Sequence, residues 1–273
     1  MKRVVCCFLI VIQFLLGGFG VVAANKIENH VEMPEWDKVN KLLPKYSKFT
    51  VVDMETGKKF KVQRRAGSHH ADVQPLTSKD TKIMKNIYGG KWSWKRRAIF
   101  IIHNKKRIAA SMHGMPHGGG ALQNDFPGHF CIHFYGSTTH RTNSMDLSHM
   151  LMVYKASGKL KQYLSTADPY QVINAYIAGF KQQDSVIVSN ISLQKVKWNP
   201  ILDKVENVRV TRLEQLPPED LTHEISLDVP AEVDWYIKDV GRQTFRGEIH
   251  LIRFSPADAW KVDSKPFIEE NHF

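Results

Sequence analysis

Cysteine is scarce in this sequence, and two of its three cysteines lie in one N-terminal apolar run. Of the three cysteines in 273 residues, Cys6 and Cys7 fall in an N-terminal apolar run and Cys131 stands alone. A chain that loses this run has no second thiol for an internal disulfide. About 249 residues would remain, enough for one large or two modest hydrophobic cores without disulfides. Internal repeats and low-complexity tracts are also missing, which excludes a repeat array.

The first 24 residues have the parts of an export signal. A positively charged start precedes an apolar run at residues 4–22, and the small residues Ala23 and Ala24 close it. This pattern predicts a signal peptide at residues 1–24, cleaved after Ala24, and a secreted or cell-surface protein. The alternative is an uncleaved membrane anchor, because the run is nearly long enough to span a bilayer.

The chain carries an excess of positive charge. Its formal net charge is +11, and removing the signal takes away Lys2 and Arg3, which leaves +9. Such a surface favours anionic partners. No RNA- or DNA-binding motif accompanies the charge, so we expect anionic cell-wall polymers and not nucleic acid. Membrane association is expected only if the signal stays attached, and solubility alone is the other explanation of the charge.

The hydrophobic pattern predicts a β-rich α+β protein in two parts. A lead-in segment at 25–48 precedes a first domain at 49–185, and a β-rich C-terminal domain follows at 186–273. Short runs separated by Pro, Asp and Gly indicate that this last domain is a small all-β sandwich or barrel. The elements expected of the first domain are strands at 49–54, 58–65, 97–103 and 106–113, and helices at about 76–88, 146–156 and 168–183. The strands expected of the second lie at 186–192, 207–214, 223–229, 233–238 and 247–254.

The stretch 113–134, HGMPHGGGALQNDFPGHFCIHF, surrounds the lone cysteine with histidines. An unpaired thiol in an oxidising compartment requires deep burial, intermolecular pairing or chemistry. His129 and His133 flank Cys131 at two residues on either side, so in a strand all three project from one face. Nearby imidazoles lower a thiol pKa and supply a base for nucleophilic catalysis. The alternative is a buried core cysteine whose neighbouring histidines make local hydrogen bonds.

The spacing in this stretch resembles the signature of the L,D-transpeptidase catalytic family. That signature is a histidine, a spacer, Ser or Thr, then His-Gly-Cys, a hydrophobic residue and Asn or Arg. In this sequence His113 is followed, after 14 intervening residues, by Gly128, His129, Phe130, Cys131, Ile132 and His133. The chain is therefore similar to a divergent member of the family, and the resemblance implies an L,D-transpeptidase-like β core with flanking helices.

The activity implied by the resemblance is acyl transfer between peptidoglycan stem peptides through a thioester, without a cofactor. Cys131 would be the nucleophile and His113 the base that takes its proton. The carbonyl of Gly114 would orient His113, and His129 would support the site. Backbone N–H groups near the sulfur would hold the developing oxyanion, as acyl transfer requires.

Three departures from the signature fall where the family contacts its substrate. Gly128, Phe130 and His133 are therefore expected to shape substrate binding. The Phe130 ring stands where the family's glycine lets the backbone crowd the substrate. The His133 imidazole can hold a carbonyl but cannot form the bidentate clamp of an arginine. Donor or acceptor specificity is therefore expected to differ.

The abundance of histidine leaves two other functions open. A zinc-dependent cell-wall peptidase could use His113 and His117, four residues apart, with Asp72 or Asp125 as acidic ligand. Pro116 and the following glycines make a helix there unfavourable, which weakens this spacing as a metal motif. The third possibility is a non-catalytic cell-wall binding protein that relies on its basic surface and C-terminal domain.

Overall fold

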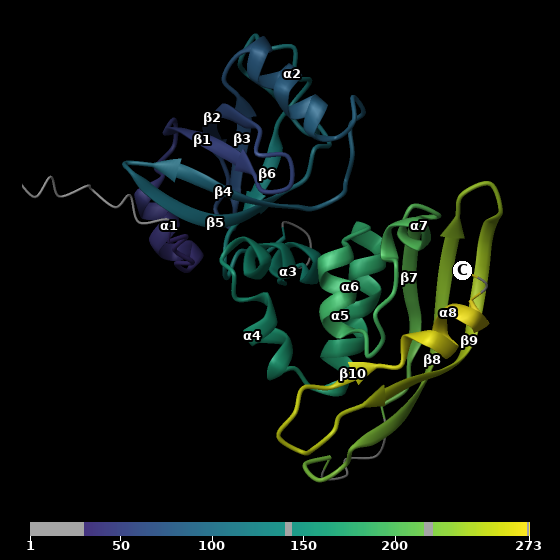
Figure 1. Ribbon diagram of the computed structural model, residues 1–273. Helices are drawn as coiled ribbons and strands as arrows, with labels where there is room; N and C mark the ends of the chain where they lie inside the picture. Colours follow the sequence, from purple (N-terminus) through teal and green to yellow (C-terminus); the bar gives the residue numbers. More distant parts are fainter. Residues whose placement is uncertain (1–29, 140–143, 216–220, 272) are drawn as a thin grey trace, which may run out of the picture.

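The computed structural model describes residues 30–139, 144–215, 221–271 and 273. The expected signal peptide and its cleavage site lie outside these ranges. None of the helices in the described part of the chain has both the length and the apolar character needed to cross a membrane. The described chain forms a six-stranded barrel, followed by helices that cover a curled four-stranded sheet (Figure 1).

The first part is a closed barrel with strand order β1-β2-β3-β6-β5-β4, and neighbouring strands are antiparallel. Apolar side chains at alternate strand positions fill the barrel, as the two-residue period of a strand requires. Its elements are α1 Trp36–Leu42, β1 Lys48–Asp53, β2 Lys59–Ala66, β3 Ala71–Pro75, α2 Ser78–Ile87, β4 Arg97–His103, β5 Lys106–Met112 and β6 Phe130–His133.

Local sequence signals explain most of these elements. Helix α2 begins after Thr77, whose side chain accepts a hydrogen bond from the N–H of Asp80, as an N-cap does. Strands β4 and β5 are joined by a turn in which Asn104 and Lys105 have φ of 48° and 65°. The four strands and the helix predicted in this region are confirmed. Strand β3 was not predicted, because it is short and follows two histidines.

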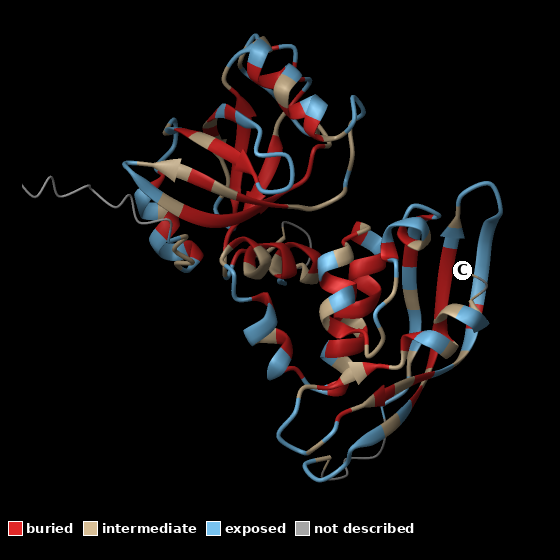
Figure 2. Ribbon diagram, in the orientation of Figure 1, coloured by how far each residue is buried: buried red, intermediate tan, exposed pale blue. Residues whose placement is uncertain are grey.

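The second part consists of a four-stranded sheet and the helices that pack on it. Its sheet has the order β10-β9-β8-β7, and helix α5 packs along β7. Figure 2 shows that buried residues are concentrated in the barrel strands, in α3 and in α5. The elements are α3 Leu147–Ala156, α4 Leu160–Ser165, α5 Pro169–Gln182, α6 Ser185–Ile191, α7 Trp198–Leu202, β7 Val205–Leu213, β8 Ser226–Ile237, β9 Gly241–Ile252, β10 Lys261–Val262 and α8 Ser264–Glu270.

The β-rich α+β class is confirmed, but the expected all-β C-terminal domain is wrong. Residues 185–191 form helix α6 instead of a strand, because the side chain of Asp184 accepts hydrogen bonds from the N–H groups of Val186 and Ile187 and caps it. Helices α3, α5 and α6 share one hydrophobic core with the sheet. The boundary expected near residue 185 therefore falls inside a single packed unit.

Two strands predicted at 223–229 and 233–238 are one strand, β8. Pro230 suggested an interruption, since proline lacks the N–H that a central strand needs. The neighbouring strand β7 pairs from Val205 opposite Ile237 to Leu213 opposite Ala231, so Pro230 lies just beyond its end. The missing donor therefore falls where the partner strand stops, and β8 continues.

The two parts meet on the outer face of the barrel. Ala98 of β4 and Ala109 of β5 point out of the barrel and belong to the core of the second part. Helix α3 packs on these two strands, and small side chains allow its close approach. The helix is capped at its start by Asp146, which accepts the N–H of His149. This packing brings His149 to the polar outer face of the barrel.

A buried ion pair joins the end of β1 to the start of β4. Asp53 at the end of β1 is fully buried and accepts hydrogen bonds from Arg97 Nε at 2.6 Å and Nη2 at 2.8 Å. Thr56 donates its N–H and hydroxyl to the same carboxylate. Burial acts to raise the pKa of Asp53, but these hydrogen bonds outweigh it and hold the pKa below the ordinary value of 3.8.

We expect Asp53→Asn to lower the free energy of unfolding by about 3 kcal/mol, because it removes the buried counter-charge of the Arg97 guanidinium and leaves only the half-exposed Glu55 beside it. Glu55→Gln is the matched control: Glu55 contacts Arg97 at 2.8 Å but is half exposed, and its loss should cost less than about 1 kcal/mol. Urea unfolding at neutral pH measures both. Because the folded pKa is depressed, the carboxylate's contribution is present above pH 3.8 and disappears as the pH falls through the folded value. Equal effects of the two changes would contradict this role.

Candidate functional site

The lone thiol faces an aspartate across two neighbouring strands. Cys131 of β6 pairs with Asp72 of β3 in the antiparallel register. Their neighbours Phe130 and Ile132 point into the barrel core, so alternation turns Cys131 outward. Cys131 is nevertheless only 4% exposed, because other polar side chains surround it on the outer face. The site therefore lies outside the barrel wall and beneath a polar cover.

A hairpin brings His117 over the thiol. His117 and His129 lie opposite each other, and each donates its backbone N–H to the other's carbonyl at 2.9 Å. Gly128 has φ of 120°, and a Cβ there would lie 2.5 Å from the His117 carbonyl oxygen. A Cβ on Gly118, which has φ of 59°, would lie 2.4 Å from the His129 ring. Only glycine permits this close crossing of the two chains.

Gln74 of β3 holds the same hairpin from below. Its buried side chain donates to the carbonyl of Gly128 at 2.8 Å. Its amide oxygen accepts the N–H of Ala121 at 2.9 Å and the N–H of Leu122 at 3.3 Å. One side chain thus satisfies three backbone groups of the loop, which would otherwise lie close to the barrel without partners. The loop is fixed to the strand that carries Asp72.

The contact between Cys131 and His117 has the geometry of a nucleophile and its base. The sulfur lies 3.3 Å from Nε2 of His117. On the other side of the ring, Nδ1 lies 3.1 Å from the carbonyl oxygen of Met115. A carbonyl can only accept, so Nδ1 carries the hydrogen and Nε2 presents its lone pair to the thiol. The backbone therefore selects the tautomer that can take the thiol proton.

Burial and the neighbouring Asp72 together keep the thiol protonated in the resting protein. Oδ1 of Asp72 lies 3.6 Å from the sulfur and 3.3 Å from Nε2 of His70. Burial of Cys131 is the largest cause that raises its thiol pKa far above the ordinary value, and the neighbouring Asp72 carboxylate adds to it. The single thiol hydrogen can be donated either to Asp72 or to Nε2 of His117. The sulfur is consequently a neutral thiol and not a preformed thiolate.

His113 lies beside His117. The ring centroids of these two histidines are 5.2 Å apart, and Trp94 covers both from outside while remaining 50% exposed. His113 itself is 4% exposed, and its Nδ1 has no hydrogen-bond partner among the described residues. Burial, aided by the charges of neighbouring histidines and Arg96, lowers the pKa of His113 to about 3. The ring is therefore neutral at physiological pH.

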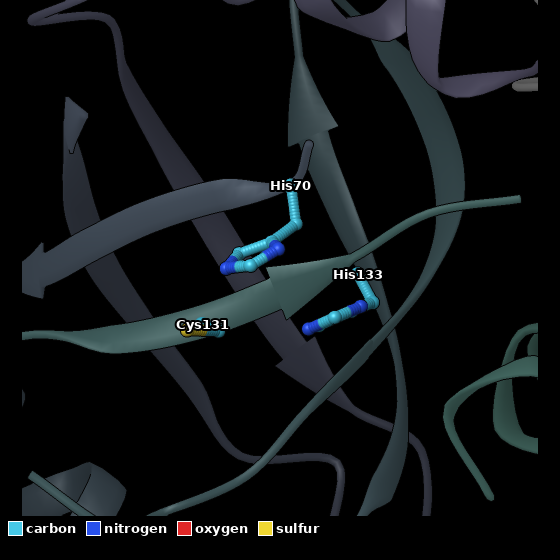
Figure 3. Close-up of side chains that lie close together, drawn as sticks. All are labelled: His70, Cys131 and His133. Atoms are coloured by element: carbon cyan, nitrogen blue, oxygen red, sulfur yellow. The ribbon is translucent and has the colours of Figure 1, made fainter. Parts of the chain in front are cut away.

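Behind the thiol, three imidazoles stack face to face. His70 lies 4.4 Å from His133, and His133 lies 3.8 Å from His149, with nearly parallel rings in both pairs. Figure 3 shows the rings of His70 and His133 on one side of Cys131. Nδ1 of His70 faces the carbonyl of Thr138 at 2.8 Å, and Nδ1 of His149 lies 2.9 Å from the hydroxyl of Ser111. Burial is the main cause that keeps the pKa of His149 well below its usual range.

Several residues predicted from the sequence have other positions than expected. Phe130, expected at the substrate, is fully buried in the barrel core against Phe60 and Phe126, so that prediction is wrong. The carbonyl of Gly114 makes no hydrogen bond to Nδ1 of His113, which has no partner in the described part of the chain. A Cβ on Gly114 would lie 2.5 Å from the Tyr88 ring, so this glycine serves packing.

The other residues predicted from the sequence differ in burial and in their distance from the thiol. Cys131, His129 and His133 share one face of the strand region, as the spacing indicated. His133 is buried in the stack, which separates it from solvent. His129 is partly exposed and its Nδ1 faces the carbonyl of Gly119 at 3.0 Å. Asp125, considered as a metal ligand, is exposed and lies in none of the possible metal-binding groups found among the described residues.

The partners that sequence reasoning did not assign to the thiol are His117 and Asp72. The sequence predicts Asp72 only as a possible metal ligand, because the short strand that carries it lacks a long hydrophobic pattern. The alternation of buried Ala71 and Val73 with polar Asp72 and Gln74 was the available signal. No protein-family model, no curated protein and no solved structure matches the chain.

We expect Gly128→Ala to destabilise the protein by about 1–3 kcal/mol, because the backbone would be strained and the new Cβ would displace the carbonyl of His117. The matched control is Gly119→Ala in the same loop, where a Cβ meets nothing within 4 Å; it should change stability by less than about 0.5 kcal/mol. Chemical unfolding of both variants measures the difference. A tolerated Gly128→Ala would show that the two chains do not cross as described.

Proposed function

We propose that this protein is a cysteine-dependent acyltransferase with Cys131 as nucleophile and His117 as general base. The observation that carries the proposal is the contact of 3.3 Å between the sulfur and Nε2 of His117, with Nδ1 of the same ring directed at the carbonyl of Met115. Nucleophile, base and a group that orients the base form the arrangement that activates a weak nucleophile. The resemblance in the sequence implied His113 as the base. We propose His117, four residues further on, in its place.

The proposed reaction has two steps that share one proton carrier. In the first step the sulfur attacks the carbonyl carbon of the donor peptide, and the thiol proton moves to Nε2 of His117. The amide C–N bond breaks as His117 returns that proton to the leaving amine, which leaves a thioester on Cys131. In the second step the amine of the acceptor attacks the thioester and its proton passes to His117. The C–S bond breaks as His117 returns that proton to the sulfur, which restores the thiol.

The raised thiol pKa determines how the first step proceeds. A neutral thiol must lose its proton as the C–S bond forms, so the resting state is not a stable thiolate–imidazolium pair. His117 then acts as serine-activating histidines do. The backbone N–H groups of His117 and His129 are already donated to each other's carbonyls, so these two cannot be the donors of the expected oxyanion hole.

The proposed substrate and location are taken from the sequence, from its resemblance to the L,D-transpeptidase family and from its export pattern. The peptidoglycan stem peptide is the proposed donor and acceptor. The export pattern of residues 1–24 supports the proposed location outside the cytoplasm, at the cell wall. Two features of the site support a peptide substrate. Trp94 is half exposed above His117, and Gly118 and Gly119 form an exposed rim beside it. An extended peptide could lie along this rim with its carbonyl near the sulfur.

We expect the protein to gain the mass of one carbapenem, a class of compound that acylates the family resembled by the sequence, and Cys131→Ala to abolish the adduct. His117→Ala should slow acylation by about 100- to 10,000-fold, because the thiol then loses its base. Intact-protein mass spectrometry over time measures both.

His103→Ala is the control for these variants, because His103 lies at the β4–β5 turn, away from the thiol, and its loss should leave the rate unchanged. His113→Ala distinguishes the two possible bases. A larger loss of rate from His113→Ala than from His117→Ala would restore the assignment from the sequence. An adduct that persists in Cys131→Ala would refute the proposal itself.

A further inference from the structure

Cys131 lies at the meeting point of three groups of possible metal ligands. The sulfur is shared by His113 and His117, by Asp72 and His129, and by His70 and His133, and within each group the ligand atoms lie within 4.8 Å of one another. A thiolate together with imidazoles is a ligand set that Zn²⁺ and other borderline divalent ions prefer. The geometry of the rings decides among the three groups.

The buried pair His70 and His133 is poorly arranged to bind one ion. Their rings are stacked, with an interplanar angle of 17°. Figure 3 shows the two rings lying nearly parallel. The lone pairs of two parallel stacked rings run side by side and do not converge on a common point. A tetrahedral ion needs ligands that approach from different directions. This pair would have to rotate before it could bind a metal together with Cys131.

The rings of His113 and His117 are tilted by 43°, which allows their nitrogens to converge. Nε2 of His117 lies 3.3 Å from the sulfur. In a tetrahedral zinc site with bonds of about 2.3 Å to sulfur and about 2.0 Å to nitrogen, these two atoms are about 3.5 Å apart. The observed spacing therefore needs only a small adjustment. Nδ1 of His117 donates its hydrogen to the Met115 carbonyl. Metal-binding histidines are commonly oriented by such a hydrogen bond from the ring nitrogen that does not bind the metal.

The burial of His113 is an observation in favour of a metal site that does not depend on the spacing between the sulfur and His117. The His113 ring is almost completely buried, and Nδ1 has no hydrogen-bond partner among the described residues. A buried polar atom without a partner is costly, and a bound ion is one way to satisfy it. The charge around the site also permits a cation. Asp72 lies 3.6 Å from the sulfur, and the nearby Arg96 is paired with Asp146 at 2.9 Å.

We propose that Cys131, His113 and His117 bind one Zn²⁺ ion. Binding replaces the thiol hydrogen by a Zn–S bond and releases that proton to solvent, and the two imidazoles bind as neutral ligands. A fourth position remains for water or another ligand. The ion would occupy the same sulfur and the same Nε2 that the proposed acyl transfer uses. Zn²⁺ therefore masks the nucleophile, and this last consequence rests on the proposed function, whereas the binding does not.

The test titrates the metal-free full chain with Co²⁺, and Zn²⁺ is then added to displace it. We expect one equivalent of Co²⁺ to produce a sulfur-to-cobalt charge-transfer band, which Zn²⁺ abolishes. Cys131→Ser should lose the band. His113→Gln and His117→Gln should each weaken binding by at least about 10-fold, since even a residue behind a ligand contributes that much. If His113→Gln does not fold, His117→Gln, at a less buried position, decides.

Two control variants locate the ion. His129→Gln tests the alternative group with Asp72, and His250→Gln tests the distant cluster with Asp228 and Glu248. Both should bind Co²⁺ as the unchanged protein does. The proposal is overturned if no cysteine-dependent band appears, or if His129→Gln loses binding while His113→Gln retains it.

Different results would refute the metal proposal and the proposed function. A protein that forms the cobalt band but is not acylated by a carbapenem when metal-free retains the metal site and loses the acyltransferase activity. A protein that is acylated at Cys131 and shows no band, with acylation unaffected by one equivalent of Zn²⁺, has the activity without the metal site.

Discussion

The packing of Phe130 and Ile132 inside the barrel is the constraint on which the site depends. Strand β6 is only four residues long, and its alternation puts these two side chains in the core and Cys131 outside. A shift of one residue in its pairing with β3 would bury the thiol among aliphatic side chains and expose two apolar residues. The hydrophobic cost of that exposure, about 1.5–3 kcal/mol for each side chain, fixes the register. The opposition of Cys131 and Asp72 follows from it.

Around this fixed thiol, burial favours the neutral forms of several groups. Six histidines lie near Cys131, and burial lowers the pKa of His113 and of His149. The thiol remains protonated for the same reason, since burial and Asp72 both oppose the thiolate. The two proposals give this protonated thiol two fates. In the proposed acyl transfer its proton moves to His117 as the sulfur attacks a substrate carbonyl, and in the proposed metal site a divalent ion displaces the proton.

The sequence predicted that the lone thiol and its flanking histidines share one face, and it predicted the strands that precede them. These features depend on local alternation and capping. The partners of the thiol could not be predicted in the same way. His117 reaches the sulfur only because Gly118 and Gly128 allow two chain segments to cross, a contact set by tertiary structure. The short strand that carries Asp72 lacks a long hydrophobic pattern. Helix α6 has the β-branched composition of a strand, and its Asp184 cap, together with packing against α5, outweighed that preference.

The second part of the chain completes the site and is not an independent appendage. Helix α3 carries His149 against His133, and Arg96 joins the segment that bears Trp94 to Asp146 at the start of that helix. Ala98 and Ala109 on the barrel allow α3 to sit close enough for this contact. Helix α3 in turn packs on α5, which covers the four-stranded sheet. The stack of histidines behind Cys131 is therefore held by a hydrophobic core that extends to the C-terminal strands, so a barrel cut away from that core would keep the thiol but lose one wall of its surroundings.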